Sequence, residues 1–186
     1  MRLKTVVAFA VAGVFGVSVA AGIGVAQTQP GDDALIVSAM TAAPKPVADG
    51  ATIVAMGKDG SMRVLRKGTN GVTCMPDNPT TPGPDPMCLD TNAMEWAQAM
   101  MTKKAPPNKV GFVYMLAGGS DASNTDPYAA GPTGANHWIS TGPHVMVVGP
   151  AAAVMAGYPT SPDPDTTKPY VMWAGTPYAH LMIPMK

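Results

Sequence analysis

The sequence predicts an α+β domain with a mainly antiparallel sheet, two or three short helices and long loops rich in proline and glycine. Short apolar runs that suit strands recur along the chain, and clusters of turn residues separate them. Helical spacing of apolar residues appears in only a few short stretches, and the strand–helix–strand rhythm of a parallel sheet is absent. Glycine and proline number 20 each, which favours long loops of fixed shape. The alternative class is an all-β sandwich decorated with helices.

The first 26 residues have the pattern of a secretory signal peptide. Arg2 and Lys4 give a basic start, and the chain then runs uncharged and apolar from Thr5 to Ala26. Small residues before the end of this run place the expected cleavage after Ala26, with a cut after Ala21 as second choice. An uncleaved membrane anchor is the competing interpretation. Residues 27–186 then form a single exported globular domain of ordinary size.

The charge of the expected mature chain excludes an electrostatic nucleic-acid binder. After loss of Arg2 and Lys4 the chain has 10 basic and 12 acidic residues, and no basic stripe follows any segment. We therefore expect no nucleic-acid partner. Cleavage of the signal also leaves no segment for stable membrane insertion. The expected location is periplasmic or secreted.

Two cysteines enclose a segment that has little apolar content to hold it in place. Cys74 and Cys88 flank residues 75–87, which are rich in proline. In an oxidising compartment such a pair is expected to form a disulfide. Closing a loop of this size contributes about 3 kcal/mol on the chain-entropy argument. The spacing fits neither a zinc site nor a Cys-x-x-Cys redox motif.

In the N-terminal half, apolar spacing predicts a helix that begins near Asp32 and ends before Pro44 and Pro46. Strands are expected over residues 52–56, 62–67 and 72–75. Asp-Gly and Asn-Gly pairs in the connections favour tight hairpins, so the three strands are predicted to form an antiparallel meander.

In the C-terminal half, a second helix is expected from Asn92, with Glu95 completing a capping box. A buried strand over residues 110–116 follows, and then a long loop over residues 120–137. Further strands are expected to begin at His144, Tyr170 and His180.

Two C-terminal segments repeat the order tryptophan, turn proline, histidine and methionine. They run from Trp138 to Met146 and from Trp173 to Met182, and each has a histidine two residues before a methionine. If the strands that begin at the histidines pair, four side chains can share one face of the sheet, namely His144, Met146, His180 and Met182. Imidazole and thioether ligands suit copper, so these four residues form a candidate copper site. Methionine occurs 15 times in the chain, so a structural role is the competing interpretation.

A second candidate site is a shallow groove that binds a small molecule between aromatic side chains. Its expected lining consists of Tyr128, His137, Trp138, Trp173 and Tyr178. The competing interpretation is that these rings pack beneath long loops that have little other core.

A hydrolase is the third hypothesis. Ser120 lies close in sequence to acidic and imidazole side chains that could serve as orienting acid and base, namely Asp121, Asp126, His137 and His144. The chain has no Gly-x-Ser-x-Gly elbow. Any polar loop that contains a histidine would provide the same set of residues. The sequence therefore favours a protein that is not an enzyme.

Three stretches resemble an uncharacterised family of small exported bacterial proteins. They are Asp126-Pro127-Tyr128, the run from Trp138 to Met146, and the ending from Gly175 to Pro184. The resemblance implies export and implies no activity, cofactor or functional residue.

These patterns together predict an exported cell-envelope protein that serves as a non-catalytic binding or accessory domain. Its partner is expected to be a small molecule or another envelope protein. A periplasmic copper-binding protein with His and Met ligands is the first alternative, and a Ser/His/Asp hydrolase is the second.

Overall fold

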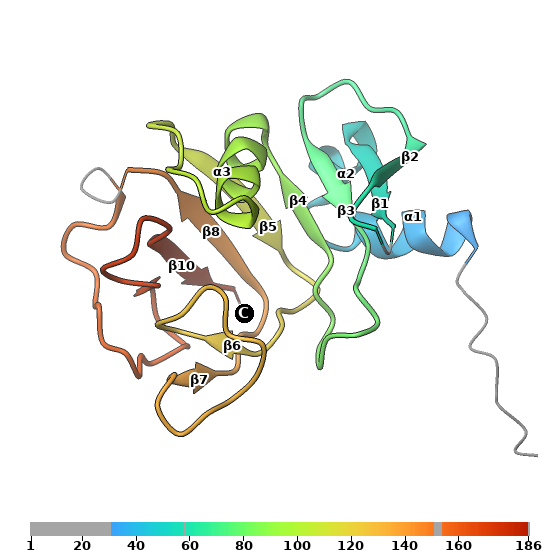
Figure 1. Cartoon of the computed structure of the whole chain (residues 1–186). Helices are drawn as coiled ribbons and strands as arrows, with labels where there is room; N and C mark the ends of the chain where they lie inside the picture. Colours follow the sequence, from blue (N-terminus) through green and yellow to red (C-terminus); the bar gives the residue numbers. More distant parts are fainter. Residues whose placement is uncertain (1–30, 58, 151–153, 186) are drawn as a thin grey trace, which may run out of the picture.

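An eight-stranded sheet forms the centre of the computed structural model, which describes residues 31–57, 59–150 and 154–185 (Figure 1). In spatial order its strands are β2 (Met62–Arg66), β1 (Thr52–Met56), β3 (Thr73–Met75), β4 (Met87–Leu89), β5 (Gly111–Met115), β8 (His144–Val148), β10 (His180–Pro184) and β9 (Tyr170–Met172). All neighbouring pairs are antiparallel except β1 with β3, which is parallel. The predicted α+β class and mainly antiparallel sheet are confirmed. The expected signal peptide lies outside the described residues.

Three helices and a short ribbon accompany the sheet. The helices are α1 (Asp32–Met40), α2 (Lys45–Gly50) and α3 (Thr91–Met101). The ribbon pairs β6 (Ala122–Ser123) with β7 (Trp138–Ile139), which are the two ends of the long loop.

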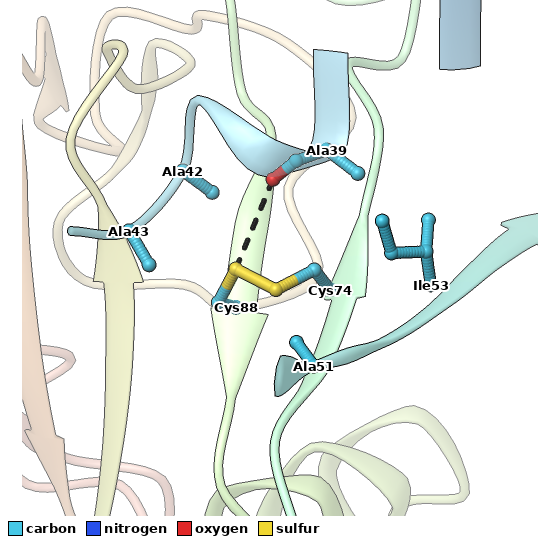
Figure 2. Packing of buried hydrophobic residues seen from close by; sticks show 7 residues of the cluster. All are labelled: Ala39, Ala42, Ala43, Ala51, Ile53, Cys74 and Cys88. Atoms are coloured by element: carbon cyan, nitrogen blue, oxygen red, sulfur yellow. Dashed lines mark hydrogen bonds between the residues drawn. A yellow bond between two sulfur atoms is a disulfide. The ribbon is translucent and has the colours of Figure 1, made fainter. Parts of the chain in front are cut away.

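The disulfide lies on the sheet face that α1 covers. Cys74 and Cys88 are directly opposed on β3 and β4, with their Cα atoms 4.0 Å apart, and their sulfur atoms are bonded. Figure 2 shows the bridge among small buried side chains from α1, the segment after it, and the start of β1, which are Ala39, Ala42, Ala43, Ala51 and Ile53. Because alanines leave little bulk between helix and sheet, α1 approaches the bridge closely, and Cys88 Sγ lies 3.8 Å from the carbonyl oxygen of Ala39. The predicted disulfide is therefore present.

The opposite face of the sheet packs against α3. Side chains alternate along β4 and β5, so Leu89 and Val113 point away from the disulfide and meet Ala93 and Trp96 of the helix. The backbones of α3 and β5 approach most closely at Gly111, where an added Cβ would lie 2.8 Å from the Cα of Ala93. Helix α3 thus requires a glycine on the strand beneath it.

Several local predictions for the N-terminal half were wrong. Strand β3 pairs in parallel with β1, so β1, β2 and β3 form no meander. The segment after β2 instead returns past Gly50, whose carbonyl oxygen accepts hydrogen bonds from the amides of Thr69 and Asn70. Helix α2 is a second difference, because the sequence predicts that Pro44 and Pro46 end a helix. Proline also suits the first turn of a helix, and Pro46 lies in the first turn of α2.

Helix α3 has a different cap from the one predicted. Asp90, rather than Asn92, caps it, and its carboxylate accepts a hydrogen bond from the Ala93 amide at 2.8 Å. Glu95 is not part of a capping box; its carboxylate pairs with Lys109 at 2.7 Å.

Removing the disulfide is expected to lower the free energy of unfolding by about 3 kcal/mol, because the unfolded chain regains the entropy of a loop of this length. The variant is Cys74→Ala/Cys88→Ala, and chemical denaturation measures the change. An unchanged denaturation midpoint would show that the bridge is dispensable.

Replacing Gly111 by alanine is expected to destabilise the protein by about 1–3 kcal/mol, because the new methyl group overlaps the backbone of α3. Gly134→Ala is the matched control, since a Cβ at Gly134 meets no atom within 4 Å. Thermal unfolding of both variants checks the prediction. Equal melting temperatures for the two variants would contradict the proposed close packing.

Candidate functional site

Strands β8 and β10 pair, as the repeated histidine–methionine pattern predicted. They run antiparallel, with Met146 directly opposite Met182. Because side chains alternate, His144, Met146, His180 and Met182 all lie on the sheet face that also packs against α3. The four candidate copper ligands therefore share one face.

The same register places the two histidines at opposite ends of the strand pair. His144 lies opposite Pro184, whereas His180 lies opposite Val148. The two histidine positions are thus four residues apart along β10, or about 13 Å. The methionine pair lies between them. The structure brings His144 near Met182 and does not bring the two imidazoles into one coordination sphere.

His180 is enclosed by aromatic rings. Its ring centroid lies 4.8 Å from that of Trp173 and 5.4 Å from that of Trp96, with edge-to-face geometry in both pairs. The two indole rings stack on each other with their centroids 6.2 Å apart. The Nδ1 atom of His180 donates to the carbonyl oxygen of Tyr178 at 3.0 Å, while Nε2 is buried and has no hydrogen-bond partner among the described residues.

His144 has the same local geometry but a different environment. Its Nδ1 donates to the carbonyl oxygen of Gly142 at 2.7 Å, which fixes the neutral tautomer with a lone pair on Nε2. The imidazole lines a cavity of 280 Å³ at the end of β8 and β10. Burial lowers the pKa of His144, so the neutral form dominates at neutral pH.

The cavity has an uncharged, partly sulfur-rich lining. Besides His144 it is lined by Thr141, Gly142, Pro143, Thr166, Thr167, Tyr170, Met182, Pro184 and Met185. Burial raises the pKa of the Tyr170 phenol to about 12, so the hydroxyl stays protonated at neutral pH. The lining residues thus include one histidine, three threonines, one tyrosine and two methionines. The hydroxyl groups of Thr141 and Thr167 donate to Ser120 and Asp165.

Nearby backbone contacts hold His144 in place. Thr141 Oγ1 donates to the carbonyl oxygen of Ser120 at 2.6 Å, and the backbone of Gly119 lies so close that a Cβ there would be 2.9 Å from His144 Cε1. The Met185 amide donates to the carbonyl oxygen of Pro143 at 2.8 Å, which fixes the chain just beyond β10. The cavity is thus built on ordered backbone.

Sequence reasoning found part of this lining and missed the rest. It included His144 and Met182 and named neither Thr166 nor Thr167. These residues belong to the segment before β9, whose position over β10 depends on tertiary folding. No pattern of spacing in the chain gives that position.

Two of the five expected groove residues, Tyr128 and Tyr178, pack together beside α3. Tyr128 and Tyr178 meet edge to face at 6.1 Å, and Tyr178 meets Trp96 of the helix at 6.4 Å. Their hydroxyl groups donate to the carbonyl oxygens of Met100 and Lys104 at the end of α3. None of the five groove residues, which also include Trp173, His137 and Trp138, lines the cavity beside His144.

The long loop is fastened to the sheet by polar contacts. Asn124 is buried and donates to the carbonyl oxygens of Ser161 and Pro162, both at 3.0 Å. The Trp173 indole donates to the carbonyl oxygen of Ser123 at 2.9 Å. Together with β6 and β7, which pack over β9 and β10, these contacts give the loop a structural role.

The proposed hydrolase residues do not form a hydrogen-bonded triad. Ser120 donates its hydroxyl to Asp85 at 2.8 Å, and His137 pairs through Nδ1 with Asp163 at 2.9 Å. Asp126 accepts from the amide of Tyr128 as part of a turn. The structure thus gives no activated serine at this place.

Among the described residues, no group of three or more His, Cys, Asp or Glu side chains is placed to hold a metal ion. Comparisons with protein-family models, with known proteins and with solved structures find no match. The resemblance to small exported bacterial proteins stays a prediction.

Acid is expected to destabilise the protein through His180. Burial lowers the pKa of its imidazole to about 4, against 6.5 for an unperturbed histidine. Between these values the unfolded chain binds a proton that the folded chain excludes, so the free energy of unfolding falls as the pH is lowered. The loss by pH 4 is about 3 kcal/mol, and denaturant titrations from pH 7 to pH 4 measure it.

The control for this prediction is His180→Leu, which removes the titrating group and keeps an apolar side chain of moderate size. Its unfolding free energy should depend less steeply on pH over the same range, with a remaining slope from His144. An unaltered slope in His180→Leu would assign the acid sensitivity to other groups.

Proposed function

We propose that this protein is an exported cell-envelope domain that binds a small ligand without transforming it, and that the cavity beside His144 is its binding site. The observation that supports this proposal most directly is an imidazole whose outer nitrogen is left without a hydrogen bond among the described residues, in the wall of a 280 Å³ cavity. Ligand sites commonly combine an apolar lining with a few fixed polar groups. His144, Tyr170 and the threonines provide such groups.

The contacts around Ser120 and His137 support binding over catalysis. Acyl transfer needs a nucleophile in hydrogen-bond reach of a base. Ser120 instead stabilises the loop that contains Asp85, and His137 joins two surface loops through Asp163. Each of these side chains has a structural partner that accounts for its position.

A periplasmic or secreted location is part of this proposal. The Cys74–Cys88 bridge supports it, because disulfides persist in oxidising compartments. Among the described residues, no helix has both the length and the apolar character that spanning a membrane requires. The N-terminal sequence pattern supplies the export signal that this location requires.

A thermal-shift screen of residues 27–186 against small organic molecules tests the proposal. At a concentration of 100 times Kd, a specific ligand stabilises the folded state by about 2.7 kcal/mol, which raises Tm by several degrees. The rise should be lost in His144→Phe and reduced in Tyr170→Phe. Tyr158→Phe is the matched control, because Tyr158 is exposed and lies outside the cavity lining.

Two outcomes would overturn the proposal. A rise in Tm that persists in His144→Phe would place the ligand elsewhere. Hydrolysis of p-nitrophenyl acetate that disappears in Ser120→Ala would establish the hydrolase alternative instead.

A further inference from the structure

We propose that the cavity ligand is a single Cu(I) ion, held by Nε2 of His144 and by the thioether sulfur atoms of Met182 and Met185. This inference rests on the proposed binding function of the cavity and names its ligand. It also revises the four-residue set expected from the sequence, because His180 is at the far end of the strand pair.

The sheet register places the first two donors within reach of each other. His144 on β8 lies opposite Pro184, so Met182, two residues earlier on β10, is its diagonal neighbour on the same face. Diagonal neighbours in an antiparallel pair are about 7–8 Å apart at Cα, which long side chains bridge. His144 and Met182 therefore occupy neighbouring positions on one face of the strand pair, and both line the cavity.

The third donor comes from the chain just after β10. Met185 lines the same cavity as His144 and Met182, and the hydrogen bond from its amide to Pro143 fixes its backbone beside the turn that precedes β8. Its side chain is 46% exposed, so it is free to turn over a bound ion. A flexible thioether at the mouth suits the entry of the ion.

A hydrogen bond already fixes the tautomer and ring orientation that His144 would need as a metal ligand. Metal-binding histidines usually donate their other ring N–H to a carbonyl or carboxylate, which fixes the tautomer and the ring orientation. His144 makes this contact with the carbonyl oxygen of Gly142 at 2.7 Å. Its Nε2 atom is consequently the nitrogen available to an ion in the cavity.

The chemistry of the lining selects the ion. Thioether sulfur is a soft ligand, and sites of imidazole and thioether favour Cu(I) over the harder divalent ions that prefer carboxylate oxygen. Among residues 31–57, 59–150 and 154–185, no carboxylate, thiolate or other charged side chain lines the cavity. A neutral site compensates the lost hydration of a monovalent ion more readily than that of a divalent ion.

The imidazole of His180, unlike that of His144, does not line the cavity. Its Nε2 atom is also unpartnered among the described residues, yet Trp96 and Trp173 flank its ring, and it is absent from the cavity lining. The aromatic enclosure offers no second donor beside this nitrogen. His180 is therefore assigned to the core, and His144 alone to the ion.

The test is anaerobic competition of residues 27–186 with the Cu(I) chelator bicinchoninate. The wild-type domain is expected to bind one Cu(I) ion. Met182→Leu and Met185→Leu should each weaken Cu(I) binding by about tenfold or more, and His144→Gln by at least as much. X-ray absorption of the copper complex should show sulfur scattering that decreases in Met185→Leu.

Matched controls separate ligand loss from general damage. Met101→Leu removes a methionine of similar exposure from α3, and His180→Gln removes the second strand histidine. Both should leave Cu(I) affinity within about twofold of wild type, well inside the tenfold loss expected for a ligand. Since Met185 is exposed, Met185→Leu is expected to fold normally, and its Tm verifies this.

The possible outcomes distinguish this inference from the proposed function. Absence of Cu(I) binding, or binding that Met182→Leu and Met185→Leu leave unchanged, would overturn the copper site. The cavity would still be a binding site if an organic molecule raised Tm in a way that depended on His144. Zn(II) binding of equal strength through the same three residues would overturn the assignment to a soft ion.

Discussion

The antiparallel pairing of β8 with β10 is the constraint on which the rest of this site depends. Both strands begin with a histidine that is followed two residues later by a methionine. Antiparallel pairing brings the methionines together and sends the histidines to opposite ends. One histidine therefore enters the aromatic core beneath α3, and the other reaches the cavity at the strand ends. Two segments that share the His-x-Met order thus acquire two different chemical environments.

Different kinds of residue pack against the two faces of the sheet. At one end of the sheet, the disulfide packs beneath Ala39 of α1 and beneath Ala42 and Ala43 in the segment after it. Trp96 of α3, together with Trp173 and Tyr178, covers the middle of the other face. Beyond α3 the ribbon of β6 and β7 continues this cover over β9 and β10. The cavity lies where this cover ends, so its position follows from the limited length of the covering elements.

Local sequence was enough to predict most strands and the face that their side chains share. Alternating apolar residues located β5, β8, β9 and β10 to within about two residues, as expected of strongly patterned segments. Pairing direction and register do not follow from local sequence, so β3 is wrongly predicted to lie in a meander. Whether His144 and His180 converge depends on the register of β8 and β10, which the sequence leaves open. Threonines 166 and 167 join the cavity through tertiary packing of a proline-rich loop, and no local signal marks them.

The two histidines show that environment, rather than residue type, decides which imidazole is available to a ligand. Each donates Nδ1–H to the carbonyl two residues earlier, and each keeps a lone pair on Nε2. For His180 this lone pair is buried without a partner, which costs about 1–3 kcal/mol, and the surrounding aromatic contacts must offset the cost. For His144 a donor from solvent or a ligand can satisfy the same atom at the cavity.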